Sequence, residues 1–265
     1  MSGQPHTAIS VDNACIQYTL QGSGNIGLIF VHGAWGNRTH WQAQIEHFSP
    51  KYNAAAIDLA GHGESSIGTR TTFTMRAFGH DVQAVVNQLG LEWVVLIGHS
   101  MGGAVILEAE HLMPERVLGL IGIDTFVYNP YQEVDKEQAR LRKTDLQVDF
   151  PNKVYQFCRN LFHPETNPDL AEHVSKEAGK TSPLVGISEF EGLLRWNIRN
   201  ALPGVQAPIQ CVCSTWAFEP RTTYLFPEFF DIKFMPDVGH FIMLEDPETF
   251  NYLLEESIDE LEKYR

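Results

Sequence analysis

The sequence of residues 94–103, VVLIGHSMGG, places a serine between glycines directly after an apolar run. The run has the composition of a buried strand, and a helical apolar pattern follows it from residue 102. A serine at such a corner has two interpretations. The glycines either only let the chain reverse, or they permit a strained turn that exposes the Ser100 hydroxyl as a nucleophile.

The composition indicates one large globular domain, or a domain with an insertion. The chain has 265 residues, of which 43% are hydrophobic and 20% are charged. Lys and Arg number 19 against 33 Asp and Glu, a net charge of −14 that argues against nucleic acid or an anionic membrane as partner. We see no signal-peptide pattern and no apolar run of bilayer length, and we expect a soluble, cytoplasmic protein.

Short apolar runs alternate with helical patterns along most of the chain. Helices are expected over 78–90 and 102–113, and a weaker pattern predicts an edge hairpin from about 7–11 and 15–21. The alternation predicts an α/β fold, with a mostly parallel sheet covered by helices on both faces. The other expected strands are 27–31, 53–58, 93–98, 117–124, 209–214 and 231–235.

The alternation stops between residues 126 and 206. Charged helical patterns and prolines replace the strands there, and sheet-like patterning returns after ALPGVQAP. We therefore predict a core domain from 1–125 and 207–265, with 126–206 inserted as a helical layer above the sheet.

Three residues suited to acyl-transfer chemistry follow predicted strands. Ser100 follows 93–98, Asp124 ends 117–124, and His240 comes shortly after 231–235. The carboxyl ends of parallel strands meet at one edge of a sheet, where ligands bind. An imidazole can take the serine proton, a carboxylate can hold the imidazole tautomer, and the Met101 N–H at the helix start can stabilise an oxyanion.

The motifs together resemble the α/β-hydrolase family. They are G-x-S-x-G at 98–102, HG at 32–33, DLAGHGES at 58–65 and GH at 239–240, in the family's chain order of serine, acid and histidine. The resemblance implies a mostly parallel eight-stranded sheet and makes 126–206 the helical cap. It also implies Ser100 as nucleophile, His240 as general base, and the N–H groups of Ala34 and Met101 as the oxyanion hole.

The position of the acid that would orient the imidazole departs from the family's usual pattern. Most members carry it after the strand before the last one, where this chain has Ala217. A minority carry it one strand earlier, at the place of Asp124. We expect Asp124 to be the acid, with Glu219 as the alternative and the lack of any orienting acid as a third possibility.

Other residues of the motifs are expected to be structural. His32 should bond to nearby loop backbone, and His99 should be a packed or hydrogen-bonded residue whose side chain points away from Ser100. Asp58 and Ser65 should cap loops. Asp81 is expected to be solvated or to tether a loop, and His62, between two glycines, is a weaker candidate for the pocket. The four scattered cysteines fit neither a zinc pattern nor a disulfide framework, and we expect no metal and no cofactor.

The expected substrate is a small to medium, fairly apolar ester. Trp35, which follows Ala34, is expected to contact the substrate. Phe126, one of many aromatic residues of the insertion, is expected to contact it as well. The predicted activity is that of a serine carboxylic-ester hydrolase. The alternatives are a lactone, amide or carbon–carbon bond hydrolase with the same triad, and a non-catalytic binding protein.

Overall fold

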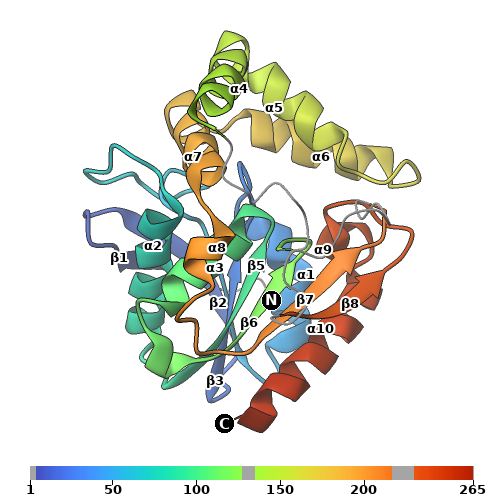
Figure 1. Ribbon diagram of the computed structural model, residues 1–265. Coiled ribbons are helices and arrows are strands. Elements are labelled where there is room, and N and C mark those ends of the chain that lie inside the picture. Colours follow the sequence, from blue (N-terminus) through green and yellow to red (C-terminus); the bar gives the residue numbers. More distant parts are fainter. Residues whose placement is uncertain (1–3, 127–134, 217–229, 265) are drawn as a thin grey trace.

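The chain folds around an eight-stranded sheet. The computed structural model describes residues 4–126, 135–216 and 230–264 (Figure 1). The strand order is β1-β2-β4-β3-β5-β6-β7-β8, antiparallel at the β1–β2 and β2–β4 pairs and parallel elsewhere. The strands are β1 Gln4–Ile9, β2 Cys15–Gln21, β3 Ile26–Val31, β4 Asn53–Ile57, β5 Trp93–His99, β6 Val117–Ile123, β7 Ile209–Ser214 and β8 Phe230–Met235.

The mostly parallel sheet and its antiparallel edge hairpin are confirmed. The hairpin differs in its limits, because β1 ends at Ile9 and not at residue 11. The Ser10 N–H donates to the Ala14 carbonyl, and Asn13 takes a positive φ of 61°, which closes a tight turn before β2.

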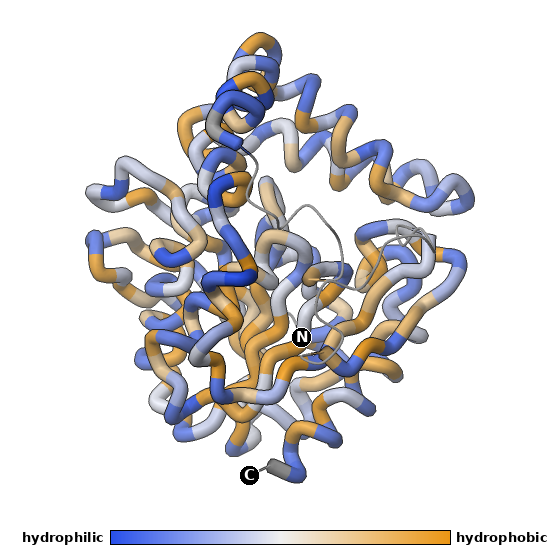
Figure 2. The backbone as a smooth tube through the Cα atoms, viewed as in Figure 1, coloured by the Kyte–Doolittle hydropathy of each residue, from blue (hydrophilic) through white to orange (hydrophobic). Residues whose placement is uncertain are grey.

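Helices cover both faces of the sheet, as predicted. Helices α2 (Met75–Leu89) and α3 (Met101–Glu110) pack on one face, while α1 (Gln42–Phe48) and α10 (Pro247–Leu261) pack on the other (Figure 1). The side chains of β5 alternate between the two cores, because successive residues of a strand point to opposite faces. Both faces of the strand are therefore apolar, and the hydrophobic segments of the backbone gather in the sheet (Figure 2).

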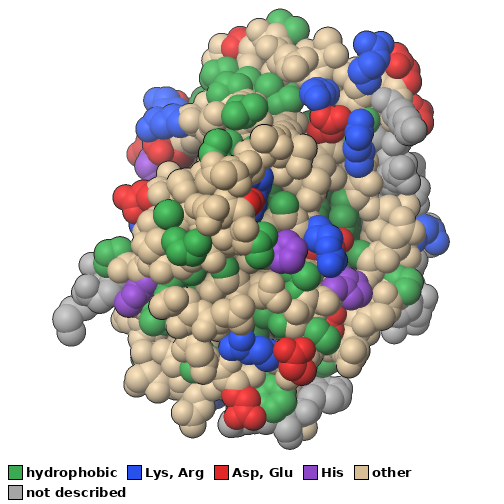
Figure 3. All heavy atoms as spheres, turned by 90° about the vertical axis from the view of Figure 1, so that its left-hand side faces the viewer, with side chains coloured by type: hydrophobic (Ala, Val, Ile, Leu, Met, Phe, Trp, Pro, Cys, Tyr) green, Lys and Arg blue, Asp and Glu red, His purple; other side chains and the backbone are tan. Residues whose placement is uncertain are grey.

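Four helices lie above the carboxyl ends of the strands (Figure 1). We call α4 (Lys136–Val148), α5 (Phe150–Arg159), α6 (Pro168–Gly179) and α7 (Pro183–Arg195) the cap helices; the short α8 (Ile198–Ala201) leads back to the sheet. Hydrophobic side chains gather at the top of the molecule, over these helices (Figure 3). The limits of the predicted cap domain, 126–206, stay a prediction.

Among the described residues, none of the helices is both long enough and apolar enough to cross a membrane.

Asp81 is not solvated, contrary to one of the two expectations for it. Its carboxylate has no exposed surface and accepts bonds of 2.6 and 2.9 Å from the Arg70 guanidinium. The Ser10 hydroxyl and the Ala60 N–H donate to it as well, at 2.7 and 3.0 Å. Asp81 therefore ties the edge hairpin and the loop after β4 to α2. The tethering interpretation is confirmed, but in the interior of the protein.

Asp81→Ala should lower the free energy of unfolding by about 3 kcal/mol, because it leaves the buried Arg70 cation with only the more exposed Asp12 as a partner. Equilibrium unfolding in urea measures this. The double variant Asp81→Leu/Arg70→Met should regain most of the loss. A matched control is Glu64→Ala, since Glu64 is an exposed partner of Arg38 and its removal should cost less than about 1 kcal/mol. A loss below that limit for Asp81→Ala would contradict the assignment.

Candidate active site

The register of the parallel strands aligns the candidate site residues. Val31 of β3 pairs with Gly98 of β5, and His99 pairs with Ile123 of β6. The residues that follow these pairs, including Ser100 and Asp124, consequently leave the sheet at the same edge. This is the edge that the cap helices cover (Figure 1).

Ser100 occupies a strained corner between β5 and α3. Its φ of 52° and ψ of −117° are those of the first central residue of a type II′ turn, a position that favours glycine. The corner is also crowded. A Cβ at Gly98 would lie 2.3 Å from the Gly102 carbonyl oxygen, and one at Gly102 would lie 2.6 Å from that of Val31. Only residues without a Cβ fit on both sides of Ser100.

Asp124 and His240 are in contact. The His240 Nδ1–H donates to Asp124 Oδ2 at 2.5 Å, while Asp124 Oδ1 accepts from the Ser214 N–H at 2.9 Å. The carboxylate has no exposed surface, and the imidazole is 13% exposed. This bond fixes the imidazole tautomer and leaves Nε2 as an acceptor. The alternative acid, Glu219, lies outside the described residues.

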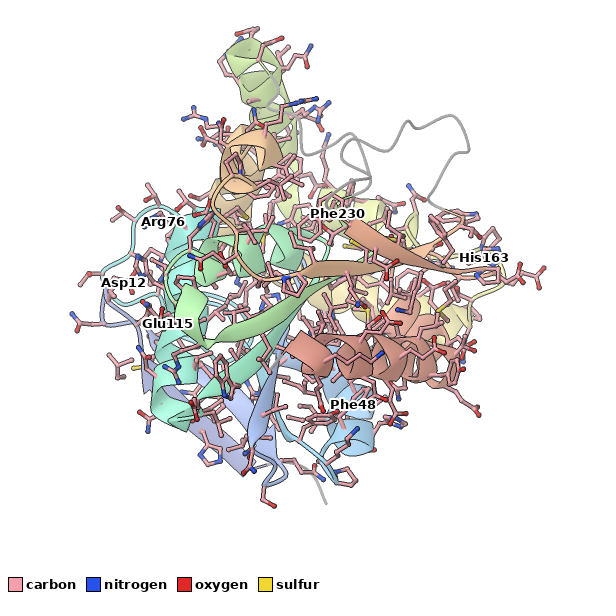
Figure 4. The ribbon with its side chains drawn as sticks, turned by 60° about the horizontal axis from the view of Figure 1, so that its bottom comes forward. Asp12, Phe48, Arg76, Glu115, His163 and Phe230 are labelled. Carbon is pink, nitrogen blue, oxygen red and sulfur yellow. The ribbon has the colours of Figure 1, made fainter. Side chains whose placement is uncertain are left out.

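A carboxylate that the sequence analysis missed holds the loop of His240. Glu245, in α9 (Ile242–Glu245), accepts from the N–H groups of Gly239 and Phe241 at 2.9 and 3.0 Å. It also accepts from the N–H of His163, which Figure 4 shows beside the far end of β8. Three amides from two segments converge on this one side chain, which fixes the backbone on both sides of His240. The sequence carries no signal for this convergence beyond the short spacing from His240.

His99 joins the Ser100 corner to His240. Its Nε2–H donates to the His240 carbonyl oxygen at 3.0 Å, and the two ring centroids are 4.7 Å apart. Burial lowers the pKa of His99 well below its ordinary value, so the ring is neutral. His99 is thus both buried and hydrogen-bonded, in agreement with the expectation of a packed or bonded histidine.

His32 orients the peptide that carries the Ala34 N–H. Its Nδ1–H donates to the Gly33 carbonyl at 2.8 Å, and its Nε2 accepts from the Leu59 N–H at 3.1 Å. Burial lowers the pKa of His32 well below its usual value, and both ring nitrogens are used by backbone, as expected. Across the three described ranges, the N–H groups of Ala34 and Met101 have no hydrogen-bond acceptor.

The loop motif after β4 is structural at two of its positions, as predicted. Asp58 accepts from the backbone N–H groups of Arg38 and Glu64 at 2.7 and 2.9 Å. The Ser65 hydroxyl donates to the Asp58 carbonyl at 2.7 Å. His62 is buried and lies against Glu189 of α7.

The two predicted substrate contacts differ in their surroundings. Trp35 packs among cap aromatics and lines a pocket of about 690 Å³. Phe126 is fully buried, and its ring stacks on Phe230, the first residue of β8 (Figure 4), with 5.4 Å between centroids. Contact of either residue with a substrate stays a prediction.

Comparisons with known proteins point to one family. The model of the alpha/beta hydrolase fold matches residues 28–164. A relative from Cupriavidus necator, a dihydrolipoyllysine-residue acetyltransferase component of an acetoin cleaving system, is 25% identical over 94% of this chain and 67% of its own length. The 3-oxoadipate enol-lactonase 2 of Acinetobacter baylyi is 25% identical over 93% of this chain and 94% of its own. Other curated relatives match over 28% to 33% of their own length, so the chain spans about a third of those proteins.

A solved structure supports the fold over the whole chain. The thermophilic esterase from Thermogutta terrifontis superposes with a TM-score of 0.83, covering 97% of this chain and 99% of its own, at 22% identity. The names of these three proteins differ in the reaction that they describe. The likeness therefore establishes the architecture and leaves the reaction to the residues of the site.

The strain at position 100 is measurable without any activity. Ser100→Gly and Ser100→Ala both remove the hydroxyl, but only glycine adopts φ 52° and ψ −117° without steric cost. We expect the glycine variant to be more stable than the alanine variant by about 1 kcal/mol in urea unfolding, despite the greater backbone entropy of glycine in the unfolded chain. A more stable alanine variant would show that the corner is relaxed.

The stability of the fold should depend on pH through His40, which lies under the Gly36 turn. Burial, helped by His173, lowers the pKa of His40 to about 4. Its stabilising contribution is present above the unfolded value of 6.5 and is lost as the pH falls toward 4, because only the unfolded chain binds the proton in that window. From pH 7 to pH 5, the free energy of unfolding should therefore fall by about 2 kcal/mol through this one group. His40→Phe should reduce the pH dependence of unfolding by that amount, and an unchanged pH dependence would contradict the burial of a neutral ring.

Proposed function

The chain belongs to the α/β-hydrolase fold family, and from that premise we propose that it is a serine hydrolase that cleaves carboxylic esters through an acyl-enzyme. The observation that carries the proposal is the bond between Asp124 and His240 at the edge where Ser100 leaves β5. A buried carboxylate that fixes an imidazole tautomer near a half-buried serine at a strand-to-helix corner is the arrangement that nucleophilic acyl transfer requires. The N–H groups of Ala34 and Met101 at the same edge support it further.

In the first half-reaction, the Ser100 oxygen attacks the ester carbonyl carbon while His240 Nε2 takes the hydroxyl proton. The carbonyl oxygen becomes an oxyanion, which the N–H groups of Ala34 and Met101 stabilise. The imidazolium then gives its proton to the leaving alkoxide, and the carbon–oxygen bond to the alcohol breaks. Asp124 stays ionised throughout and stabilises the imidazolium.

In the second half-reaction, water replaces the alcohol. His240 takes a proton from the water, the hydroxide attacks the acyl carbon, and the same amides hold the new oxyanion. Collapse breaks the bond to Ser100, and the imidazolium returns the proton to the Ser100 oxygen. The products are the carboxylic acid and the alcohol, and the protein is restored without any consumed cofactor.

The surroundings of Trp35 favour an apolar acyl group. Phe157 and Phe190 of the cap helices form an apolar wall of this pocket beside Trp35, together with Leu141 and Leu146. The rest of the lining is polar or charged and includes Arg142, Asp145 and Lys153. An apolar wall stabilises a hydrocarbon chain through the area that the chain removes from water. We therefore propose small to medium apolar esters as the substrate class, with Trp35 as a contact.

Two substitutions test the triad on p-nitrophenyl esters. Ser100→Ala should abolish turnover, and Asp124→Asn should lower kcat by about 10³–10⁴, because the amide stabilises the wrong imidazole tautomer. Asp237→Asn is the matched control: Asp237 is an exposed acid in the loop that precedes His240, and its variant should stay within about twofold of the wild type.

Persistent hydrolysis by Ser100→Ala would overturn the nucleophile, and unchanged kcat in Asp124→Asn would overturn the acid. A panel of esters, lactones, amides and diketones separates the reaction classes, since the same triad serves all four. Turnover of lactones alone would replace the proposed ester activity, and inactivity on the whole panel would favour a binding protein.

A further inference from the structure

Hydrogen bonds connect Trp35, the residue that follows Ala34, to the cap helix α7 and to Thr181 just before it. The Trp35 N–H donates to Glu189 Oε1 at 3.2 Å, and its indole Nε1–H donates to the Gly186 carbonyl at 3.2 Å. Its carbonyl accepts from the Thr181 hydroxyl at 3.4 Å. Both residues that receive bonds from Trp35 belong to α7, and Thr181 lies just before that helix. Every polar group of Trp35 is thus bonded to the cap side of the structure.

Trp35 needs these contacts because its backbone is strained. Its φ is 57°, in the left-handed region that non-glycine residues seldom adopt. Such a conformation persists only where surrounding contacts impose it. The indole ring adds to the restraint, because it packs against Phe150, Phe157 and Phe190.

Glu189 itself is paired with a residue of the core. Its second oxygen lies 2.9 Å from His62 Nε2, and neither side chain has any exposed surface. Burial opposes the charged form of His62, yet the Glu189 carboxylate raises the pKa of the imidazole above its usual value. A carboxylate without a counter-charge would be costly at this depth. The pair therefore spans the boundary between α7 and the loop after β4.

We propose that Glu189 is a positioning residue of the oxyanion hole, with His62 as its counter-charge, so that docking of α7 on the core sets the geometry of the Ala34 N–H. The inference rests on the proposed function. His32 holds the peptide before Ala34 through the Gly33 carbonyl, and Glu189 holds the peptide after it through the Trp35 N–H. Ala34 is therefore fixed from both sides, once by the core and once by the cap.

Three variants separate the hydrogen bond from the charge. Glu189→Leu removes both, Glu189→Gln keeps an oxygen that accepts from Trp35 but removes the charge, and His62→Gln removes only the counter-charge. Glu191→Gln is the matched control on the same helix, since Glu191 pairs with Lys143 and Arg195 away from Trp35.

Kinetics on a p-nitrophenyl ester should show a loss in kcat and not in KM. Since removal of one oxyanion donor costs about 10²–10³ in kcat, we expect about 30- to 100-fold for Glu189→Leu and about 5- to 10-fold for Glu189→Gln and His62→Gln, with KM within about threefold. Glu191→Gln should stay within about twofold. A trifluoromethyl ketone, which forms an oxyanion on Ser100, should lose affinity in parallel with kcat.

Hydrogen exchange of the Trp35 amide gives a readout apart from activity. It should be faster in Glu189→Leu, which loses the acceptor, than in Glu189→Gln, which keeps it, and Glu191→Gln should exchange as the wild type does. Raised KM with unchanged kcat, or unchanged ketone affinity, would overturn the positioning role and leave a cap-packing role. If Glu189→Leu does not fold, the other two variants decide. A wild-type protein without ester turnover would overturn the proposed function as well, whereas an active wild type with unaffected variants would overturn this inference alone.

Discussion

The close approach of β3, β5 and α3 at one corner constrains the rest of the site. A Cβ at Gly102 would lie 2.6 Å from the Val31 carbonyl oxygen, so the start of α3 can pack against the end of β3 only through glycine. That contact brings the loop after β3 against the corner, where a Cβ at Gly33 would lie 3.1 Å from the Ser100 Cβ. The positive φ of Ser100 follows from the same crowding. Such a strained conformation persists only where the surrounding structure imposes it, and the contacts at this corner do so.

Polar side chains around the corner, the buried His32 and His99 and the partly buried Glu245, hold backbone groups in place. His32 and His99 are neutral because burial lowers their pKa values. His32 donates to the Gly33 carbonyl, directly before Ala34, and His99 donates to the carbonyl of His240 itself. The Glu245 carboxylate accepts from the N–H groups of Gly239 and Phe241, and so fixes the backbone on both sides of His240. In a medium of low polarity each such bond is worth more than in water, and each unpaired partner costs more. These bonds fix the backbone on both sides of the corner.

The parts of this arrangement that depend on short-range patterns were predictable from the sequence. Apolar runs predicted the strands, and the glycines around Ser100 predicted the corner. Asp124 was identified because it lies at the end of the apolar run that forms β6, the neighbour of β5. Charged pairs between distant segments were not predictable. Asp81 and Glu189 lie on helical patterns where a solvated acid is the usual case, and only the fold brings Arg70 and His62 to them. Glu245 was missed for the same reason, since its donors come from two separate segments.

The account depends most on the claim that the corner at Ser100 brings a reactive oxygen to one imidazole and two amides. A crystal structure of the protein after reaction with a fluorophosphonate tests this directly. We predict a covalent bond from phosphorus to Ser100 Oγ, with the phosphoryl oxygen at about 3 Å from the N–H groups of both Ala34 and Met101. An adduct on another residue, no adduct at all, or a phosphoryl oxygen turned away from these two amides would contradict it.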